Sequence, residues 1–399
     1  MAPIPKHTNG SLAELQGSSV AMLKAPPARF LASPDPRGWR RRARRRLMPQ
    51  VSAALMTNPA YFEVGRYLGC YGFMNITSYS SSQFGQPPNA DGIQELDLGY
   101  SAEEIERLRV QDVGEGEVKI RLYEGRVVQG PLRGTKAVFK VYPGAHAGAS
   151  EADLMALNEL RTHSFLQSDR RDICDNIQFL LGAFETATGE QWLAFRDDGR
   201  YSAADYAKFT SERQSKEQTD LPSWNPFSRA YKLELRRYFV LRLLNGAMCG
   251  LVHMHNRDRL HQSIGPSSVV LNTVIENEGR YLVPTLRDLA FSVDIGYGAG
   301  LLVAYMAFIP FCEAGIIDGI SLQRLLESTF RLDIYAAREY CLEDDRLADA
   351  VNFLDLGDGA GWELLQAMLH PDYRKRPIAE AVLNHRFISG AVLRNYGKL

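Results

Sequence analysis

The sequence predicts an α+β fold in which a small antiparallel sheet with one helix precedes a mostly helical half. Before about residue 200, short segments alternate apolar with polar residues and are separated by turn residues, which is the period of strands. Beyond it, apolar residues recur at spacings of three and four, which is the period of amphipathic helices. The 399 residues are 45% hydrophobic, enough to bury one large core or two medium ones.

The sheet is predicted from segments whose side chains alternate between apolar and polar. Val118–Tyr123 and Lys136–Tyr142 follow this pattern and form a hairpin across a Gly-containing connection at 124–130. Two further apolar runs, 177–184 and 192–195, are joined by a short turn that contains Thr and Gly. Because consecutive strands joined by short turns pair side by side, these segments predict an antiparallel sheet.

The helices are predicted from apolar periodicity and from length. The helix between the two strand pairs is predicted over Glu151–Thr162, with three leucines on one side, Leu154, Leu157 and Leu160. The strongest helical signal spans Leu235–Leu251, where apolar residues recur every three or four positions. Leu301–Pro310 has about half the ~20 residues that a membrane span requires, so it predicts a buried core helix. Phe209–Ser228 is polar, contains two prolines and predicts an exposed insertion.

Basic residues are concentrated at the N-terminus. Residues 1–60 hold ten Lys and Arg against two acids, a charge of +8, whereas the remainder carries −9. A start rich in Ser, Ala, Pro and Arg is typical of an organelle transit peptide, so we expect a chloroplast address, with the mitochondrion as an alternative. The run Arg40–Arg46 is also compatible with a nuclear signal or a nucleic-acid patch. We expect residues 1–55 to form a disordered basic N-terminus.

The five cysteines favour neither a metal site nor a disulfide framework. They are odd in number and far apart, with no Cys-x-x-Cys pair and no His at metal-ligand spacing. Small buried thiols are the ordinary explanation for cysteines in apolar surroundings.

Several motifs follow one another in a recognisable order along the chain. They are the strand end Ala137–Lys140, the helix end Gly250–His255, the loop His261–Leu271, the triplet Asp288–Ala290 and the segment Leu364–Phe387. In this order they resemble the eukaryotic protein-kinase family. The resemblance implies a bilobal fold, with a small antiparallel-sheet N-lobe and a mostly helical C-lobe. It divides the chain into a basic N-terminus at 1–55, an N-terminal extension at 56–115, a kinase-like domain at 116–390 and a tail at 391–399.

The resemblance implies a site for ATP and Mg²⁺. Lys140 stands where the strand lysine of the family pairs the α and β phosphates, and either Glu151 or Asp153 on the next helix would orient it. Asp288 stands at the position of the Asp that holds Mg²⁺. The nucleotide contacts that the resemblance implies are Gly125, Val127, Val138, Lys140, Asp153 and Asp288.

The loop His261–Leu271 departs from the family at the residues that perform the chemistry. Ser263 occupies the place of the base and Ser268 the place of the metal-binding Asn. A serine hydroxyl does not accept a substrate proton at neutral pH, and general-base catalysis contributes ~10²–10⁴-fold in rate. Mg²⁺ prefers an amide or carboxylate oxygen to a neutral hydroxyl. With Gly125 as the third glycine of a phosphate-covering loop, the first two glycine places hold larger residues, which weakens that cover.

These departures favour a pseudokinase that serves as a nucleotide-binding or scaffold and regulatory module for a protein partner. The alternative is a divergent, active ATP-dependent Ser/Thr kinase with an atypical catalytic loop. The basic start and the degenerate kinase region also resemble plastid-lipid-associated, fibrillin-like proteins that carry a kinase-like part. That second resemblance implies association with a plastid membrane or plastoglobule. No specific nucleic-acid partner is predicted.

Overall fold

A computed structural model describes residues 55–73, 118–144, 149–169, 171–219, 226–261, 263–289 and 297–396. The predicted transit peptide and most of the predicted N-terminal extension therefore lie outside the described residues. The part predicted as a C-terminal tail contains a short helix at Ala391–Tyr396, in which Val392 is buried.

The first part of the described fold is a five-stranded antiparallel sheet with the strand order β1-β2-β3-β5-β4. Its strands are β1 Phe62–Phe73, β2 Val118–Val127, β3 Lys136–Tyr142, β4 Leu180–Glu185 and β5 Gln191–Arg196. The predicted hairpin is confirmed, because β2 pairs with β3 and places Leu122 opposite Lys140. Strand β1 comes from the predicted extension and supplies one edge of the sheet.

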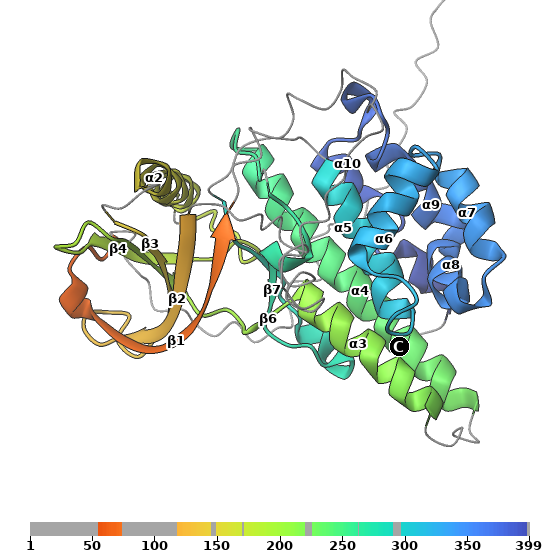
Figure 1. Cartoon of the computed structure of the whole chain (residues 1–399), viewed down its shortest axis with the longest axis horizontal. Coiled ribbons are helices and arrows are strands. Elements are labelled where there is room, and N and C mark those ends of the chain that lie inside the picture. Colours follow the sequence, from red (N-terminus) through yellow and green to blue (C-terminus); the bar gives the residue numbers. More distant parts are fainter. Residues whose placement is uncertain are drawn as a thin grey trace, which may run out of the picture. The chain divides into compact units, whose positions relative to one another are not determined.

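The helix α2, Ala149–Leu166, covers one face of this sheet (Figure 1). Along β3, successive side chains point to opposite faces, so Lys140 and Tyr142 lie on the face that α2 covers. The side of α2 that packs there presents small residues, Ala152 and Ala156 among them. Of the three leucines expected on one side of this helix, Leu154 is 60% exposed and Leu157 is 37% exposed, whereas Leu160 packs against the sheet.

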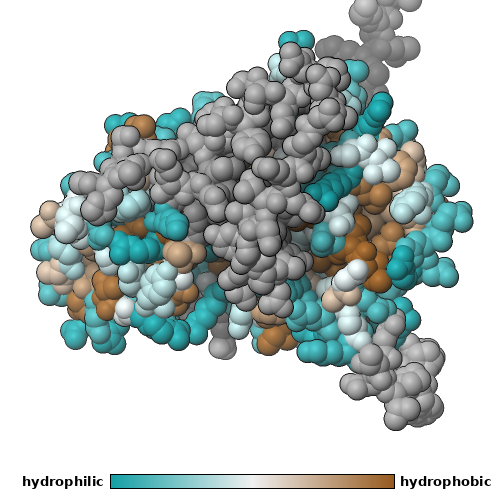
Figure 2. Space-filling model, in the orientation of Figure 1, coloured by the Kyte–Doolittle hydropathy of each residue, from teal (hydrophilic) through white to brown (hydrophobic). Residues whose placement is uncertain are grey.

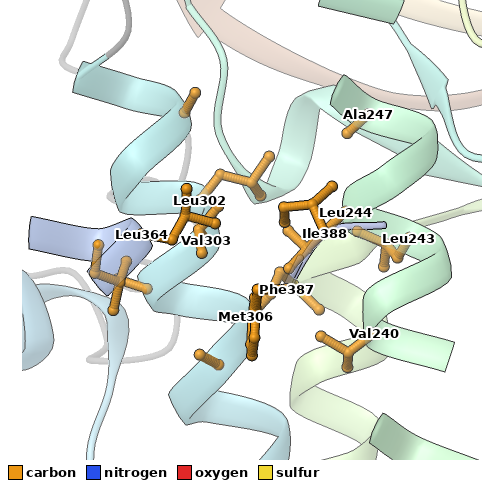
Figure 3. Packing of buried hydrophobic residues seen from close by; sticks show 14 of the residues in the cluster. Val240, Leu243, Leu244, Ala247, Leu302, Val303, Met306, Leu364, Phe387 and Ile388 are labelled. Atoms are coloured by element: carbon orange, nitrogen blue, oxygen red, sulfur yellow. The ribbon is translucent and has the colours of Figure 1, made fainter. Parts of the chain in front are cut away.

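The second part is mostly helical, as predicted. Its helices are α3 Ala203–Thr219, α4 Pro226–His255, α5 Tyr297–Phe308, α6 Gly319–Arg324, α7 Ile334–Leu342, α8 Ala348–Leu354, α9 Leu356–Met368 and α10 Ala379–Asn384. Apolar side chains of α4 such as Leu244 face those of α5 such as Val303, and Phe387 lies between the two helices (Figure 3). The helix α5 confirms the buried core helix predicted near Leu301, and the α+β architecture with two lobes is confirmed.

The segment predicted as an exposed insertion is helical over most of its described residues, and those from Glu212 to Lys216 are intermediate or exposed. Within α3, Thr210 and Ser211 are buried, together with Tyr206 and Ala207. The packed side of this helix is built from small and hydroxyl-bearing residues, so its polar composition did not reveal it.

A three-stranded sheet joins the sheet-bearing part to the helical part. Strand β6, Tyr201–Ser202, pairs with β7, Val269–Leu271, which pairs with β8, Thr285–Leu286. The short helix η4, Pro266–Ser268, immediately precedes β7. These pairings place the predicted loop and the predicted Asp288 at neighbouring ends of β7 and β8.

Hydrophilic residues cover most of the coloured surface in Figure 2, and hydrophobic residues form separate small groups. Among the described residues, no helix combines the length and the apolar character that crossing a bilayer requires.

Candidate functional site

The site is centred on Lys140, whose ammonium lies between two carboxylates. Its Nζ is 2.5 Å from Oε1 of Glu159 on α2 and 2.5 Å from Oδ1 of Asp288 after β8. Lys140 is 3% exposed, Glu159 is fully buried and Asp288 is 7% exposed. Buried charges are stable only when they are paired and hydrogen-bonded, and this arrangement satisfies both conditions. The structure therefore brings Lys140 and Asp288, which the resemblance assigns to ATP and Mg²⁺, into direct contact.

The acidic partner of Lys140 on α2 is Glu159, so the prediction of Glu151 or Asp153 is wrong. The residues of α2 that face the sheet follow a helical period through Ala152, Ala156 and Glu159, whereas Asp153 lies on the exposed side. The same periodicity in the sequence identifies Glu159, provided that the alanines rather than the leucines are taken as the packed side.

Glu159 is held by further groups around the ion pair. The hydroxyl of Tyr142, two residues along β3 from Lys140, donates a hydrogen bond to Oε2 of Glu159. Nε2 of His163, one turn further along α2, is 3.9 Å from Oε1 of Glu159. Burial, reinforced by the nearby Lys140 charge, lowers the pKa of His163 to about 3, so its ring is neutral near pH 7. The phenol was not identified by the sequence reasoning.

Asp288 is fixed on both its backbone and its side chain. Its φ of 66° lies in the left-handed region, which Asp tolerates better than most non-glycine residues. Its carbonyl accepts a hydrogen bond from Ser263 Oγ at 3.2 Å. Nε2 of His261 donates to the carbonyl of Arg287 at 2.9 Å, and burial lowers the pKa of His261 to about 4. A neutral His261 and Ser263 thus hold the segment that carries Asp288.

Both serines of the predicted loop form hydrogen bonds with backbone groups. Ser268 Oγ donates to the carbonyl of Gly265 at 2.8 Å and accepts from its N–H at 2.9 Å. Ser263 Oγ donates to the carbonyl of Asp288, as above. The contacts of Ser268 are local, which is the usual task of serine in turns, whereas that of Ser263 joins the loop to the segment of Asp288.

Two of the predicted nucleotide contacts lie on the wrong face of the sheet. Val127 is buried with Phe139, opposite the face of Lys140. Gly125 is within β2, where an added Cβ would lie 2.3 Å from the Glu63 carbonyl and 2.4 Å from the Phe139 ring. Its lack of a side chain therefore permits close packing against β1 and β3 and does not serve a phosphate-covering loop.

A phosphate-covering loop would connect the first two strands of the sheet, which are β1 and β2 and not β2 and β3. Residues 124–127 of the predicted Gly-containing connection belong to strand β2, and the strand that precedes β2 is β1. The connection between β1 and β2 comprises residues 74–117, which lie outside the described residues. Val138 does lie on the Lys140 face and is half-buried.

The residues present do not fit the predicted Mg²⁺ site. Oδ1 of Asp288 is engaged by Lys140, and its Oδ2 is 3.2 Å from Nε of Arg287. Ser268, at the second ligand position, is tied to Gly265. Mg²⁺ requires near-octahedral oxygen ligands, and both carboxylate oxygens here already face cations. Within the described ranges, no cluster of His, Cys, Asp and Glu has the arrangement of a metal site.

Comparisons with known proteins do not assign a function to this site. No protein-family profile and no curated protein matches the chain. One similar solved structure is described as "Crystal structure of a Stt7 homolog from Micromonas algae soaked with ATP". It shares 15% sequence identity, with 76% of this chain and 97% of that chain covered, at a TM-score of 0.47. The described residues themselves define an α+β protein with a buried Lys-Glu-Asp cluster where its two parts meet.

Proposed function

We propose that the chain is a protein-kinase-like module that does not transfer phosphate and that binds a nucleotide beside Lys140 in a regulatory or scaffold role. The observation that carries this proposal is the buried cluster of Lys140, Glu159 and Asp288. In the family that the chain resembles, a strand lysine contacts the α and β phosphates of ATP, an acid on the next helix orients that lysine, and an aspartate holds Mg²⁺. The order of sheet, α2, strand pair and helical part also agrees with that resemblance.

The loss of phosphotransfer is inferred from the two serines. Neither Ser263 nor Ser268 offers a carboxylate or amide oxygen, and both hydroxyls are engaged with the backbone. Without a general base, the rate falls by about 10²–10⁴-fold. The chain between Asp288 and α5 adds to this reading, since only residues 289–296 separate them. So short a connection leaves little chain for docking a protein substrate.

Thermal unfolding of the full chain with and without ATP tests the nucleotide part of the proposal. We expect ATP to raise the unfolding midpoint of the wild type and to have no effect on Lys140→Met. Lys136→Met is the matched control, because Lys136 is an exposed lysine on the same strand and the same face. An unchanged midpoint of the wild type at saturating ATP would reject nucleotide binding.

A divergent active kinase is the second candidate, and the assembled Lys140–Glu159 pair favours it, because active kinases require this pair. Transfer of radiolabelled phosphate from ATP to generic protein substrates distinguishes the two candidates. We expect no transfer above the level of a heat-denatured sample. Robust transfer that is abolished in Lys140→Met and retained in Lys136→Met would replace the first candidate with the second.

A further inference from the structure

Arg287 places a second fixed cation at the site, beside the residue that the resemblance assigns to metal binding. Its Nε lies 3.2 Å from Oδ2 of Asp288 and donates a hydrogen bond to the carbonyl of Ser267 at 3.1 Å. Its backbone N–H donates to the carbonyl of Ser268 at 3.0 Å. The side chain is 24% exposed, so it is mostly enclosed yet still reaches solvent. The guanidinium is thus anchored between Asp288 and the helix η4.

The charges around Asp288 are already balanced by protein groups. Lys140 and Arg287 each neutralise one oxygen of its carboxylate, and Lys140 also pairs with Glu159. A divalent ion at Asp288 would have to displace one of these cations or approach it closely. The two cations and the two carboxylates sum to zero, so the polyphosphate of a nucleotide would be attracted locally to the ammonium of Lys140 and the guanidinium of Arg287 and not to a net positive charge.

The guanidinium group of arginine is well suited to binding phosphate oxygens. Arginine is charged at every accessible pH, and its planar fork matches the oxygens of a phosphate. To the described residues, the guanidinium of Arg287 donates its hydrogen bond from Nε. Its two terminal nitrogens are therefore not committed to that part of the chain by a hydrogen bond.

We propose that this site binds the phosphates of a nucleotide without a divalent metal ion, and that Arg287 supplies the positive charge that a metal ion would otherwise provide. The inference rests on the proposed nucleotide-binding function and specifies its chemistry. It assigns a role to Arg287, which stands next to the recognised triplet and which the resemblance does not explain.

Calorimetric titration of the full chain with ATP tests this inference, in buffer with excess EDTA and in buffer with Mg²⁺. We expect the wild type to bind ATP in EDTA with a dissociation constant within about threefold of that in Mg²⁺. In EDTA, Arg287→Gln should bind at least about tenfold more weakly, the effect of losing a charge-assisted contact. Mg²⁺ should restore part of that loss, because the guanidinium then no longer faces Oδ2 of Asp288. Arg280→Gln, which removes an exposed arginine, should bind like the wild type.

The outcomes separate the inference from the function on which it rests. If the wild type binds ATP only when Mg²⁺ is present, the role of Arg287 is rejected and the proposed function stands. If it binds ATP in neither buffer, the proposed function fails and the inference fails with it. The comparison of the two buffers uses the wild type alone, so it remains decisive even if Arg287→Gln does not fold. Partial rescue by Mg²⁺ in Arg287→Gln is a response that a merely structural role of Arg287 would not produce.

Discussion

Replacing Tyr142 by Phe removes one hydroxyl from the buried network and leaves the ring in place. In the wild type, that hydroxyl donates to Oε2 of Glu159, and both residues are fully buried. A hydrogen bond to a charged group contributes about 1.5–3 kcal/mol, and an acceptor left unsatisfied in the interior costs about 1–3 kcal/mol. Because water does not reach Glu159 to replace the lost donor, we expect Tyr142→Phe to lower the free energy of unfolding by about 1.5–3 kcal/mol.

Urea denaturation of the full chain, followed by tryptophan fluorescence, measures this change, since Trp192 lies in strand β5 of the same sheet. Tyr335→Phe is the matched control, because Tyr335 is 56% exposed on α7 and should change the free energy by less than about 0.5 kcal/mol. In a double-mutant cycle, Tyr142→Phe and Glu159→Gln should be non-additive, as expected for groups in contact. Equal effects of the two tyrosine variants, or strict additivity in the cycle, would refute the direct bond.

Three other predictions follow from the same geometry. Gly125→Ala should destabilise the sheet by about 1–3 kcal/mol, because its Cβ would overlap β1 and Phe139, whereas Gly265→Ala, with open space around its Cβ, should be nearly neutral in urea denaturation. The pKa values of His163 and His261 are lowered to about 3 and about 4, so below pH 6.5 these histidines are protonated in the unfolded chain before they are protonated in the folded protein. Stability is then complete above pH 6.5 and falls by about 1.4 kcal/mol per pH unit for each histidine as the pH drops from 6.5 toward 4, a slope that His163→Asn should reduce in pH-dependent melting. A fluorescent protein fused to residues 1–60 should accumulate in chloroplasts, and accumulation in mitochondria or the nucleus would reject the predicted address.

The parts of the fold that the sequence predicted are those in which apolar residues recur at a simple period. The sequences of β2 and β3 alternate apolar with polar residues, although both faces of β3 are buried from Phe139 to Tyr142, and α4 repeats its apolar residues every three or four positions. Strand β1 was missed because its pairing with β2 shifts twice between Val64 and Gly69, which breaks the alternation. Helix α3 was missed because its packed side uses small and hydroxyl-bearing residues, which a hydropathy pattern does not register.

The site was predicted only where a residue was fixed by a local motif. Lys140 and Asp288 were recognised from their immediate neighbours, and the structure brings them together. Identifying Glu159 required knowing which side of α2 faces the sheet, and two of the predicted leucines, Leu154 and Leu157, point outward. Small residues such as Ala156 face the sheet because the helix packs closely against it. How closely a helix packs depends on the three-dimensional fold, which a local sequence pattern does not reveal. The contact of Arg287 with Asp288 likewise depends on backbone geometry at a positive φ that no sequence pattern specifies.

Arg287 has more influence on metal binding than the two serines have. A serine in place of a metal ligand removes one neutral oxygen, which a water molecule can replace in the coordination shell of Mg²⁺. A fixed guanidinium adds repulsion instead. At a separation of 4 Å and an effective dielectric constant of 20, two unit charges interact by about 4 kcal/mol, so the guanidinium offsets the attraction that the Asp288 carboxylate would exert on a divalent ion at a similar distance. Restoring Asn at Ser268 while Arg287 remains should therefore leave ATP binding independent of Mg²⁺. Removing the charge in Arg287→Gln, with Ser268 unchanged, should make that binding respond to the metal. If Ser268→Asn alone created a strong Mg²⁺ dependence in the same titration, the missing ligand rather than the added cation would govern the site.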